Sequence, residues 1–253
     1  MTDLKAVARR AIACLDLTDL SDDADEAALE ALCRRASTRH GPVAAVCVWP
    51  RFVSAARGHV QGTGIRVATV VNFPAGTDAA EEVIDMTEAA IRDGADEIDL
   101  VVPYRELLEG HDDGIPALVR RVREAADGAP VKAILETGVL GEESVIRQAA
   151  QLALEGGTDF LKTSTGKVAV NATPVSARIL LEEIRAAGRP VGLKPAGGIK
   201  STLDAAGYIA LAEEVMGADW VSPTTFRIGA SSVLNALLAT LDGEDAPAIA
   251  GGY

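Results

Sequence analysis

The sequence has few aromatic residues, few cysteines and few histidines. Aromatic side chains account for 4% of the 253 residues and hydrophobic ones for 48%, so a core must be built mainly from Ala, Val, Leu and Ile. The three histidines are scattered, and Cys14, Cys33 and Cys47 lack the spacing of metal ligands. We therefore expect no metal site, and we expect the cysteines to be buried, reduced thiols of a cytoplasmic protein.

The chain also lacks a surplus of basic residues and a long apolar run. It has 24 Lys and Arg residues and 37 Asp and Glu residues, which gives a formal net charge of −13. A nucleic-acid surface needs a basic face, so this balance argues against a nucleic-acid partner. No apolar run approaches about 20 residues, and the charged N-terminus has no signal-peptide core, so we expect no membrane partner.

The chain does contain a series of short apolar runs rich in β-branched residues. They recur at intervals of roughly 23–36 residues, the spacing of units in which strand and helix alternate. The eight strands that we predict are Ile12–Leu17, Val43–Trp49, Ile65–Phe73, Glu97–Pro103, Val131–Thr137, Asp159–Thr163, Val191–Lys194 and Trp220–Pro223.

Segments with helical character separate these runs. Thr173 and Pro174 open one of them with an N-cap residue and a proline at the first position, and Gly188 ends it. The other helices that we predict are Asp3–Arg10, Asp22–Arg39, Asp78–Asp93, Gly141–Glu155, Ser201–Met216 and Gly229–Leu241.

Eight strands with helical crossovers predict an α/β fold, a single (β/α)₈ TIM barrel with the short N-terminal helix Asp3–Arg10 capping its bottom. No linker divides residues 1–253, and the Gly/Ala/Pro-rich residues 242–253 have the composition of a mobile tail. An open doubly wound sheet is the alternative. That fold usually carries a glycine-rich loop after its first strand, whereas this strand ends in Asp16-Leu17-Thr18.

Two lysines stand in unusual places. Lys162 lies inside the apolar run of FLKTSTGK (160–167), and Lys194 has the same position in VGLKPAGGIK (191–200). A buried ammonium is costly unless it is paired or loses its proton, and an unprotonated lysine is an amine nucleophile. The two lysines therefore predict Schiff-base chemistry on a phosphorylated carbonyl compound. One would attack and the other would lower its pKa, but the pattern does not say which.

Acidic residues lie at the same ends of the predicted strands. Asp16 and Thr18 share one face of the first strand, Asp99 lies in EIDLVVPY (97–104), and Glu136-Thr137 ends the fifth strand. Active groups of a barrel lie at the carboxyl ends of its strands, so these residues should meet the lysines at one mouth. Asp99, with Asp16 nearby, could accept and donate protons. A set of structural salt bridges is the other interpretation.

The loops after the last three predicted strands combine glycine, hydroxyl and basic residues. Glycines let backbone N–H groups approach an anion, and a helix N-terminus adds its dipole. We predict a phosphate site there, as is usual in this fold. The candidate substrate-binding residues are Thr18, Thr165, Gly166, Lys167, Gly197, Gly198, Ser231 and Ser232.

These motifs together resemble one family. The segments that carry the resemblance are LDLT (15–18), VCVWPRF (46–52), EIDLVVPY (97–104), FLKTSTGK (160–167), KPAGGI (194–199) and FRIGASS (226–232). In order and spacing, over nearly the whole chain, they resemble deoxyribose-phosphate aldolase, a class I aldolase. The resemblance implies that Lys162 forms the Schiff base, that Lys194 tunes it and that Asp99 takes part in proton transfer. Some members of the family use a C-terminal tyrosine in proton transfer, and this chain ends in Tyr253; a disordered end is the other interpretation.

The expected reaction is reversible cleavage of 2-deoxyribose 5-phosphate to glyceraldehyde 3-phosphate and acetaldehyde, with a phosphorylated sugar as the small-molecule partner and with no metal or organic cofactor. Two alternatives stay open: another Schiff-base barrel, such as a transaldolase or ketose-phosphate aldolase, and a barrel that senses sugar phosphates without catalysis. The sequence does not determine the oligomeric state, and a homodimer is kept as an expectation.

Overall fold

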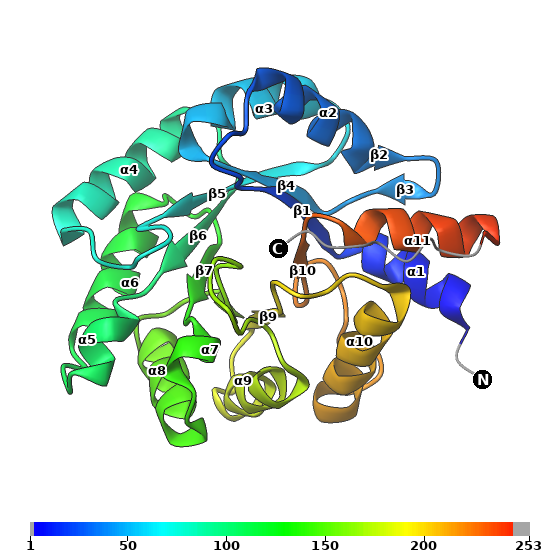
Figure 1. Cartoon of the computed structure of the whole chain (residues 1–253). Helices are drawn as coiled ribbons and strands as arrows, with labels where there is room; N and C mark the ends of the chain where they lie inside the picture. Colours follow the sequence, from blue (N-terminus) through cyan, green and yellow to red (C-terminus); the bar gives the residue numbers. More distant parts are fainter. Residues whose placement is uncertain (1–2, 245–253) are drawn as a thin grey trace.

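The computed structural model of the chain describes residues 3–244, and they form a (β/α)₈ barrel (Figure 1). Eight parallel strands follow the order β10-β1-β4-β5-β6-β7-β8-β9. The two strands at the ends of this order, β10 and β9, also lie side by side. Arg227 N–H donates to Leu193 O at 2.9 Å, and Gly229 N–H donates to Pro195 O at 2.9 Å. Figure 1 shows the helices on the outside of the strands. The predicted fold class is confirmed.

The strands of the barrel are short and consist almost entirely of buried residues. They are β1 (Leu15–Asp19), β4 (Ala45–Val48), β5 (Arg66–Val71), β6 (Glu97–Val101), β7 (Val131–Ile134), β8 (Phe160–Lys162), β9 (Gly192–Lys194) and β10 (Ile228–Ala230). A separate antiparallel pair consists of β2 (Ser37–Thr38) and β3 (Gly41–Pro42).

Four of the helices, α1, α2, α9 and α10, begin at a residue whose side chain caps the helix. Asp3 caps the first helix, and Thr173 with Ser176 forms the capping box of α9. The helices are α1 (Leu4–Ala13), α2 (Glu26–Ala36), α3 (Val53–Val60), α4 (Ala80–Arg92), α5 (Tyr104–Leu108), α6 (Gly114–Ala125), α7 (Thr137–Leu140), α8 (Glu143–Glu155), α9 (Pro174–Ala186), α10 (Thr202–Met216) and α11 (Val233–Asp242), with one 3₁₀ turn, η1 (Pro50–Phe52).

The eighth predicted strand was wrong. Residues 220–223 form turns rather than a strand: Trp220 N–H donates to Gly217 O, and Phe226 N–H donates to Ser222 O. The eighth strand is β10, three residues long and with Gly229 at its centre. A Cβ at Gly229 would lie 2.8 Å from the Ala196 side chain, so close contact with the neighbouring strand requires glycine there. The aromatic and β-branched pair Trp220-Val221 has a higher strand propensity than Ile228-Gly229-Ala230, so the sequence pattern favoured the wrong segment.

The first strand and the last helix also have boundaries that differ from the predicted ones. α1 runs to Ala13, so the first strand begins at Leu15 rather than at Ile12. α1 packs against α10 and α11, and its last residues line a cavity at the amino ends of the strands beside Pro223, which agrees with a bottom-capping role. α11 begins at Val233 because residues 228–230 are a strand, and it includes Asp242, the first residue of the predicted tail. Tyr253 lies outside the described residues.

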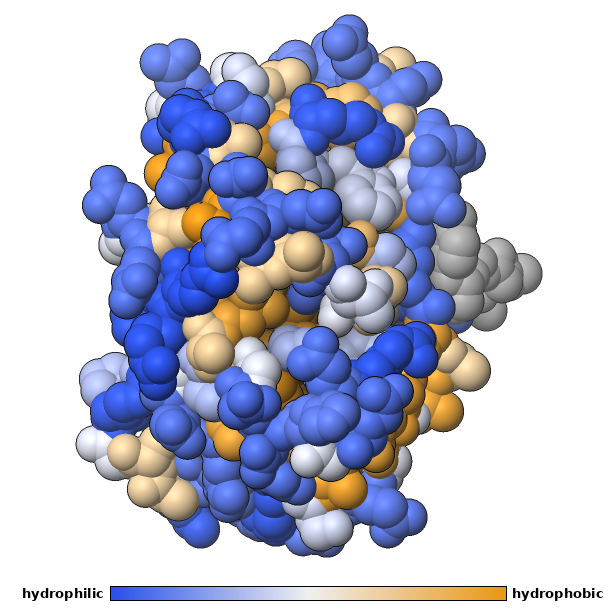
Figure 2. All heavy atoms as spheres, turned by 90° about the vertical axis from the view of Figure 1, so that its left-hand side faces the viewer, coloured by the Kyte–Doolittle hydropathy of each residue, from blue (hydrophilic) through white to orange (hydrophobic). Residues whose placement is uncertain are grey.

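One face of the barrel is largely hydrophilic. On the face over α4, α5 and α6, hydrophilic side chains cover most of the area and apolar ones show in smaller areas between them (Figure 2). Cys14, Cys33 and Cys47 are free and buried, as predicted. Within residues 3–244, no helix combines the length and the apolar character that a membrane-spanning segment requires.

Candidate active site

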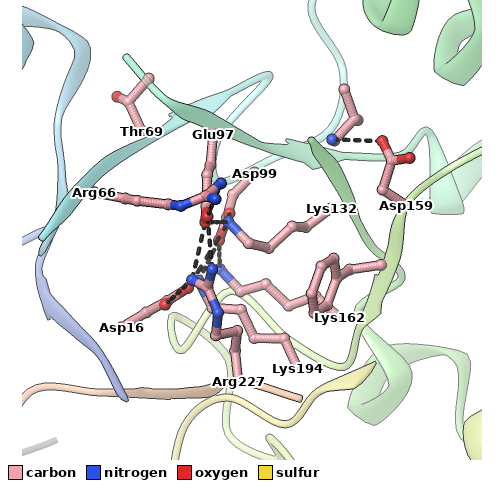
Figure 3. A network of polar contacts seen from close by, with 12 residues as sticks. Asp16, Arg66, Thr69, Glu97, Asp99, Lys132, Asp159, Lys162, Lys194 and Arg227 are labelled. Atoms are coloured by element: carbon pink, nitrogen blue, oxygen red, sulfur yellow. Dashed lines mark hydrogen bonds and ion pairs between the residues drawn. The ribbon is translucent and has the colours of Figure 1, made fainter. Parts of the chain in front are cut away.

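A cluster of charged side chains lies together inside the barrel (Figure 3). Each of its members is buried, with at most 4% of the residue exposed. We call this set the buried charge cluster; it consists of Asp16, Glu97, Asp99, Lys132, Lys162, Lys194 and Arg227. The members come from β1, β6, β7, β8 and β9 and from the residue before β10. Charges at such depth persist only when they pair with one another.

Asp99 is the centre of the cluster. Its Oδ2 accepts hydrogen bonds from Lys162 Nζ at 2.6 Å and from Lys194 Nζ at 2.7 Å. Its Oδ1 accepts one from Lys132 Nζ at 2.8 Å. Strand pairing explains this convergence, because Lys162 and Lys194 are register partners on β8 and β9, and Asp99 and Lys132 are partners on β6 and β7. Burial would raise the pKa of Asp99, but the neighbouring lysines, Lys132 first, hold it well below its usual value.

Asp16 links the lysines to the last strand. Its Oδ2 lies 2.6 Å from Lys194 Nζ, and its Oδ1 accepts a hydrogen bond of 2.6 Å from Arg227 Nη1. Arg227 also binds both oxygens of Glu97, at 2.6 and 3.0 Å. Burial would raise the pKa of Asp16, but the neighbouring cations, Lys194 first, lower it. Asp16 is therefore a carboxylate at neutral pH.

The two lysines named by the sequence differ in electrostatic setting. Burial lowers the pKa of Lys162; Asp99 opposes that effect and the ammonium of Lys194 adds to it, so the net direction is down. Burial also acts on Lys194, but Asp16 and Asp99 outweigh it and raise its pKa. Lys162 is thus the amine that gives up its proton more readily.

A cavity of about 320 Å³ opens above the cluster at the carboxyl ends of the strands. All eight of the predicted substrate-binding residues line it: Thr18, Thr165, Gly166, Lys167, Gly197, Gly198, Ser231 and Ser232. Of the four predicted catalytic residues, Lys162 lines the cavity, while Asp16, Asp99 and Lys194 lie beneath it among the buried charges. Of the three buried lysines in the described part of the chain, Lys162 is therefore the one open to a ligand.

With this geometry established, the family of the chain can be identified. A family model described as "DeoC/LacD family aldolase" matches residues 10–239, nearly the whole barrel. The chain belongs to this aldolase family. It is therefore a carbon–carbon lyase of the aldolase type, built on a TIM barrel.

Solved structures agree with the family. A protein of Toxoplasma gondii ME49, provisionally described as a deoxyribose-phosphate aldolase, is 28% identical, with a TM-score of 0.89 over 96% of this chain and 98% of that one. A protein of Coccidioides immitis with the same provisional description is 29% identical, with a TM-score of 0.83 over 92% of this chain and 86% of that one. The tetrameric deoxyribose phosphate aldolase of Aeropyrum pernix is 23% identical over 94% and 96% of the two chains, with a TM-score of 0.75, and is similar in fold.

The rim of the cavity is made of loops with special backbone conformations. Gly197 and Gly198 both have φ of +81°, which side-chain-bearing residues rarely adopt. A Cβ at Gly197 would also lie 2.7 Å from the Asn171 side chain. Asn171 lines the cavity, and its Oδ1 is buried without a hydrogen-bond donor among residues 3–244. This oxygen is an acceptor that a ligand hydroxyl could satisfy.

The start of α11 also faces the cavity. Ser232 is its N-cap residue, and no side chain caps the helix there. The first N–H groups of a helix lack partners within it, and the helix dipole places partial positive charge at this end. Together with Ser231 and the glycine loops, this end of α11 forms a local anion site on an acidic protein.

Glu136 holds one of these loops in place. It is fully buried, has a left-handed φ of 55°, and accepts hydrogen bonds from Thr165 Oγ1 at 2.5 Å and Thr165 N at 3.2 Å. Thr165 Oγ1 in turn accepts from Lys167 N–H at 3.0 Å. Burial raises the pKa of Glu136, against the hydrogen bonds from Thr165. Glu136, noted in the sequence only as a strand end, therefore fixes the shape of the loop 165–167.

Sequence reasoning missed three members of the buried charge cluster: Glu97, Lys132 and Arg227. The signal for Lys132 was present, because VKAIL places a lysine in an apolar strand just as FLK does. Glu97 and Arg227 lie inside quoted motifs, but their partners are on strands far away in sequence. Within residues 3–244, no group of His, Cys, Asp and Glu side chains is arranged to hold a metal ion.

Proposed function

We propose that this aldolase reversibly cleaves 2-deoxy-D-ribose 5-phosphate to D-glyceraldehyde 3-phosphate and acetaldehyde through a Schiff base on Lys162. The observation that carries the proposal is the position of Lys162, a buried amine with a lowered pKa that opens into a cavity ringed by glycine loops. The likeness to proteins described as deoxyribose-phosphate aldolases supports the choice of sugar.

The first chemical step is the attack of the Lys162 amine on the C1 aldehyde. Loss of water then gives an iminium, whose cationic nitrogen accepts electrons from the C2–C3 bond. An amine attacks only in its unprotonated form, and Lys162 lies in the setting that favours this form. Lys194, whose pKa is raised, supplies the neighbouring positive charge.

Cleavage needs a base for the C3 hydroxyl. Its deprotonation breaks the C2–C3 bond, releases glyceraldehyde 3-phosphate and leaves an enamine. Protonation and hydrolysis of the enamine then release acetaldehyde. Asp99 touches both lysines and is ionised at neutral pH, so we assign it, with Lys194 and a water, to these proton transfers. Asp16 holds Lys194 in place from the other side.

The phosphate of the sugar would lie among the loops after β8, β9 and β10. The backbone N–H groups of Gly166 and Gly198 and the hydroxyl groups of Ser231 and Ser232 offer donors there, while the Gly197 N–H already donates to Gly229 O at 3.2 Å. Lys167 adds positive charge at the rim, where it lies 3.3 Å from Asp22. A cavity of about 320 Å³ suits a small sugar phosphate, since small-molecule sites span roughly 300–1,000 Å³.

Borohydride trapping tests the proposal. Reduction in the presence of deoxyribose 5-phosphate should label the peptide that carries Lys162, and Lys162→Ala should lose both the label and the activity. Lys200→Ala is the matched control, because Lys200 also lines the cavity but is not part of the buried charge cluster. Label on Lys194 alone would reverse the assignment of the two lysines.

The same assays separate the alternatives. A transaldolase or ketose-phosphate aldolase would prefer fructose phosphates, whereas a sensor barrel would bind the sugar phosphate without a reducible adduct. Cytoplasmic location and a homodimer stay predictions. Light scattering would measure the oligomeric state, and the tetramer of the Aeropyrum pernix aldolase gives the competing expectation.

A further inference from the structure

We propose that Lys132 is a positioning residue of the aldolase centre: it fixes the orientation of Asp99 and balances the charge of Glu97, so that Lys162 remains the neutral amine. This inference rests on the proposed Schiff-base function. It assigns a role to a lysine that never meets the substrate, since Lys132 is fully buried and does not line the cavity.

The geometry of Asp99 supports the first half of this role. Its two oxygens have separate partners, with Oδ1 bonded to Lys132 and Oδ2 shared by Lys162 and Lys194. A carboxylate held from one side by a buried ammonium has no freedom to rotate. Lys132 therefore keeps Oδ2 directed at the two lysines of the mouth.

The charges of the cluster support the second half. Its carboxylates are Asp16, Glu97 and Asp99, and its permanent cations are Lys132, Lys194 and Arg227. These six charges cancel, so a proton on Lys162 would leave a net positive charge in a buried space, which is costly. The directions agree, since the pKa values of Lys132, Lys194 and Arg227 are raised and that of Lys162 is lowered.

Lys132 is central to this balance because it contacts two of the carboxylates. Its Nζ lies 2.7 Å from Glu97 Oε2 and 2.8 Å from Asp99 Oδ1, with Asp16 Oδ2 at 3.8 Å. Arg66 reaches Glu97 at 3.3 Å, but its side chain is 47% exposed, so water screens that charge. Without Lys132, three carboxylates would face two cations, and a proton on Lys162 would restore neutrality.

Other ionisable groups also face Lys162. Cys47 on β4 is buried, which raises the pKa of its thiol and keeps it neutral. Glu136, after β7, bonds to Thr165 and also interacts with Lys162 at longer range; burial raises the pKa of Glu136, which weakens the negative charge that it adds. Asp99 and Lys194 are already members of the cluster. Lys132 itself faces Glu97, Asp99, Asp16 and, at longer range, Lys194.

The test is the pH dependence of Lys162 in Lys132→Met, which keeps the length of the side chain and removes its charge. Reductive methylation of Lys162, followed by mass spectrometry across pH, should show its pKa raised by about one unit or more. The acid limb of kcat/KM should move up by the same amount, with about tenfold less activity at pH values on that limb and recovery in alkali. Lys5→Met, at an exposed position of α1, is the matched control.

A double variant makes the test specific. Lys132→Met with Glu97→Gln removes one charge of each sign, so the acid limb should return toward that of the unmodified protein. Glu97→Gln alone removes a negative charge and should move the limb to lower pH. This single variant keeps the proposal testable if Lys132→Met does not fold. The proposal would be overturned if Lys132→Met lost rate equally at every pH and the limbs of its pH profile did not move. It would also be overturned if the acid limb of the double variant lay where that of Lys132→Met lies.

The two proposals fail in different ways. If the unmodified protein forms no borohydride-reducible adduct with deoxyribose 5-phosphate, the proposed function fails, yet methylation still reports the pKa of Lys162. If the adduct forms but that pKa is the same in Lys132→Met, the role of Lys132 fails and the proposed function stands.

Discussion

The buried charge cluster and the cavity above it are built from opposite kinds of parts. The cluster is made of charged side chains on or beside short strands, paired with one another and almost completely buried. The cavity is lined largely by loop residues, many of them glycine, serine and threonine, and much of its capacity to bind lies in the backbone. Only Lys162 belongs to both.

This difference assigns separate tasks to the two regions. Interactions inside the cluster are strong because the surroundings are dry, so a change of one charge alters the protonation of its neighbours. Interactions in the cavity involve hydrogen bonds to an anion and alter mainly how tightly it binds. Substitutions in the cluster should therefore change kcat and its pH dependence, and substitutions in the loops should change KM.

The strongest test of this division is Lys194→Leu. Removing its charge leaves the three carboxylates with two cations, so Lys162 should keep its proton to higher pH. A rise of about two pKa units would lower the free-amine fraction, and with it the rate on the acid limb of the pH profile, by about 100-fold, with recovery in alkali. Lys194→Arg, which keeps a charge on a bulkier group, should have a partial effect.

A pH–rate profile checks this prediction, with Lys5→Leu on α1 as the control. A profile that is lower at every pH, with its limbs unmoved, would reject pKa tuning by Lys194. It would favour a direct part in proton transfer or substrate binding.

Ser232→Glu tests the cavity. It places a negative charge at the N-cap of α11, where we expect the phosphate, and repulsion should raise KM for deoxyribose 5-phosphate about 30-fold, equivalent to about 2 kcal/mol. KM for unphosphorylated deoxyribose should change much less. Ser54→Glu, on the exposed side of α3, adds the same charge elsewhere and controls for net charge. Equal effects on both sugars would mean that the phosphate binds at another place.

A smaller effect is expected from Glu136→Gln. The amide can still accept from Thr165 N–H, but its NH₂ group can only donate to Thr165 Oγ1, so the short hydrogen bond to a carboxylate is replaced by a weaker one, a loss of about 1 kcal/mol for the loop 165–167. KM for the phosphorylated sugar should rise about fivefold while kcat stays nearly constant. Glu142→Gln, at an exposed position nearby, is the matched control. A fall in kcat with an unchanged KM would place Glu136 with the charge cluster instead.

The smallest effect should come from metal removal. In the proposed reaction the iminium on Lys162 accepts the electrons of the broken bond, so a metal ion has no step to perform. Prolonged EDTA treatment should leave turnover unchanged in a coupled assay of glyceraldehyde 3-phosphate. Loss of activity that a divalent cation restores would indicate class II aldolase chemistry.

The same two regions differ in how far the sequence predicted them. The loops were predicted residue by residue, because Gly166, Gly197 and Gly198 and the hydroxyl residues near them lie in short local motifs. Two of the lysines and two of the carboxylates were predicted as well, since each lies within or at the end of an apolar run. Their roles stay predictions until they are tested.

The rest of the cluster depends on how the barrel closes. Arg227 meets Asp16 across 211 positions of the chain and Glu97 across 130, and no local pattern encodes such pairs. The eighth strand was misplaced for the same reason. Three residues with a central glycine become a strand only where β1 and β9 supply their partners.

The chain order of these parts has a consequence for how the protein matures. Arg227 is the guanidinium of the cluster, and it precedes β10, the last strand to leave the ribosome. Before that strand docks, the barrel is open to water on that side, so burial does not lower the pKa of Lys162. Nascent and partly folded chains would then carry an ammonium at this position. The neutral amine that reacts with aldehydes would form only when the barrel is complete. An unfinished chain would therefore not react with an aldehyde substrate at this lysine.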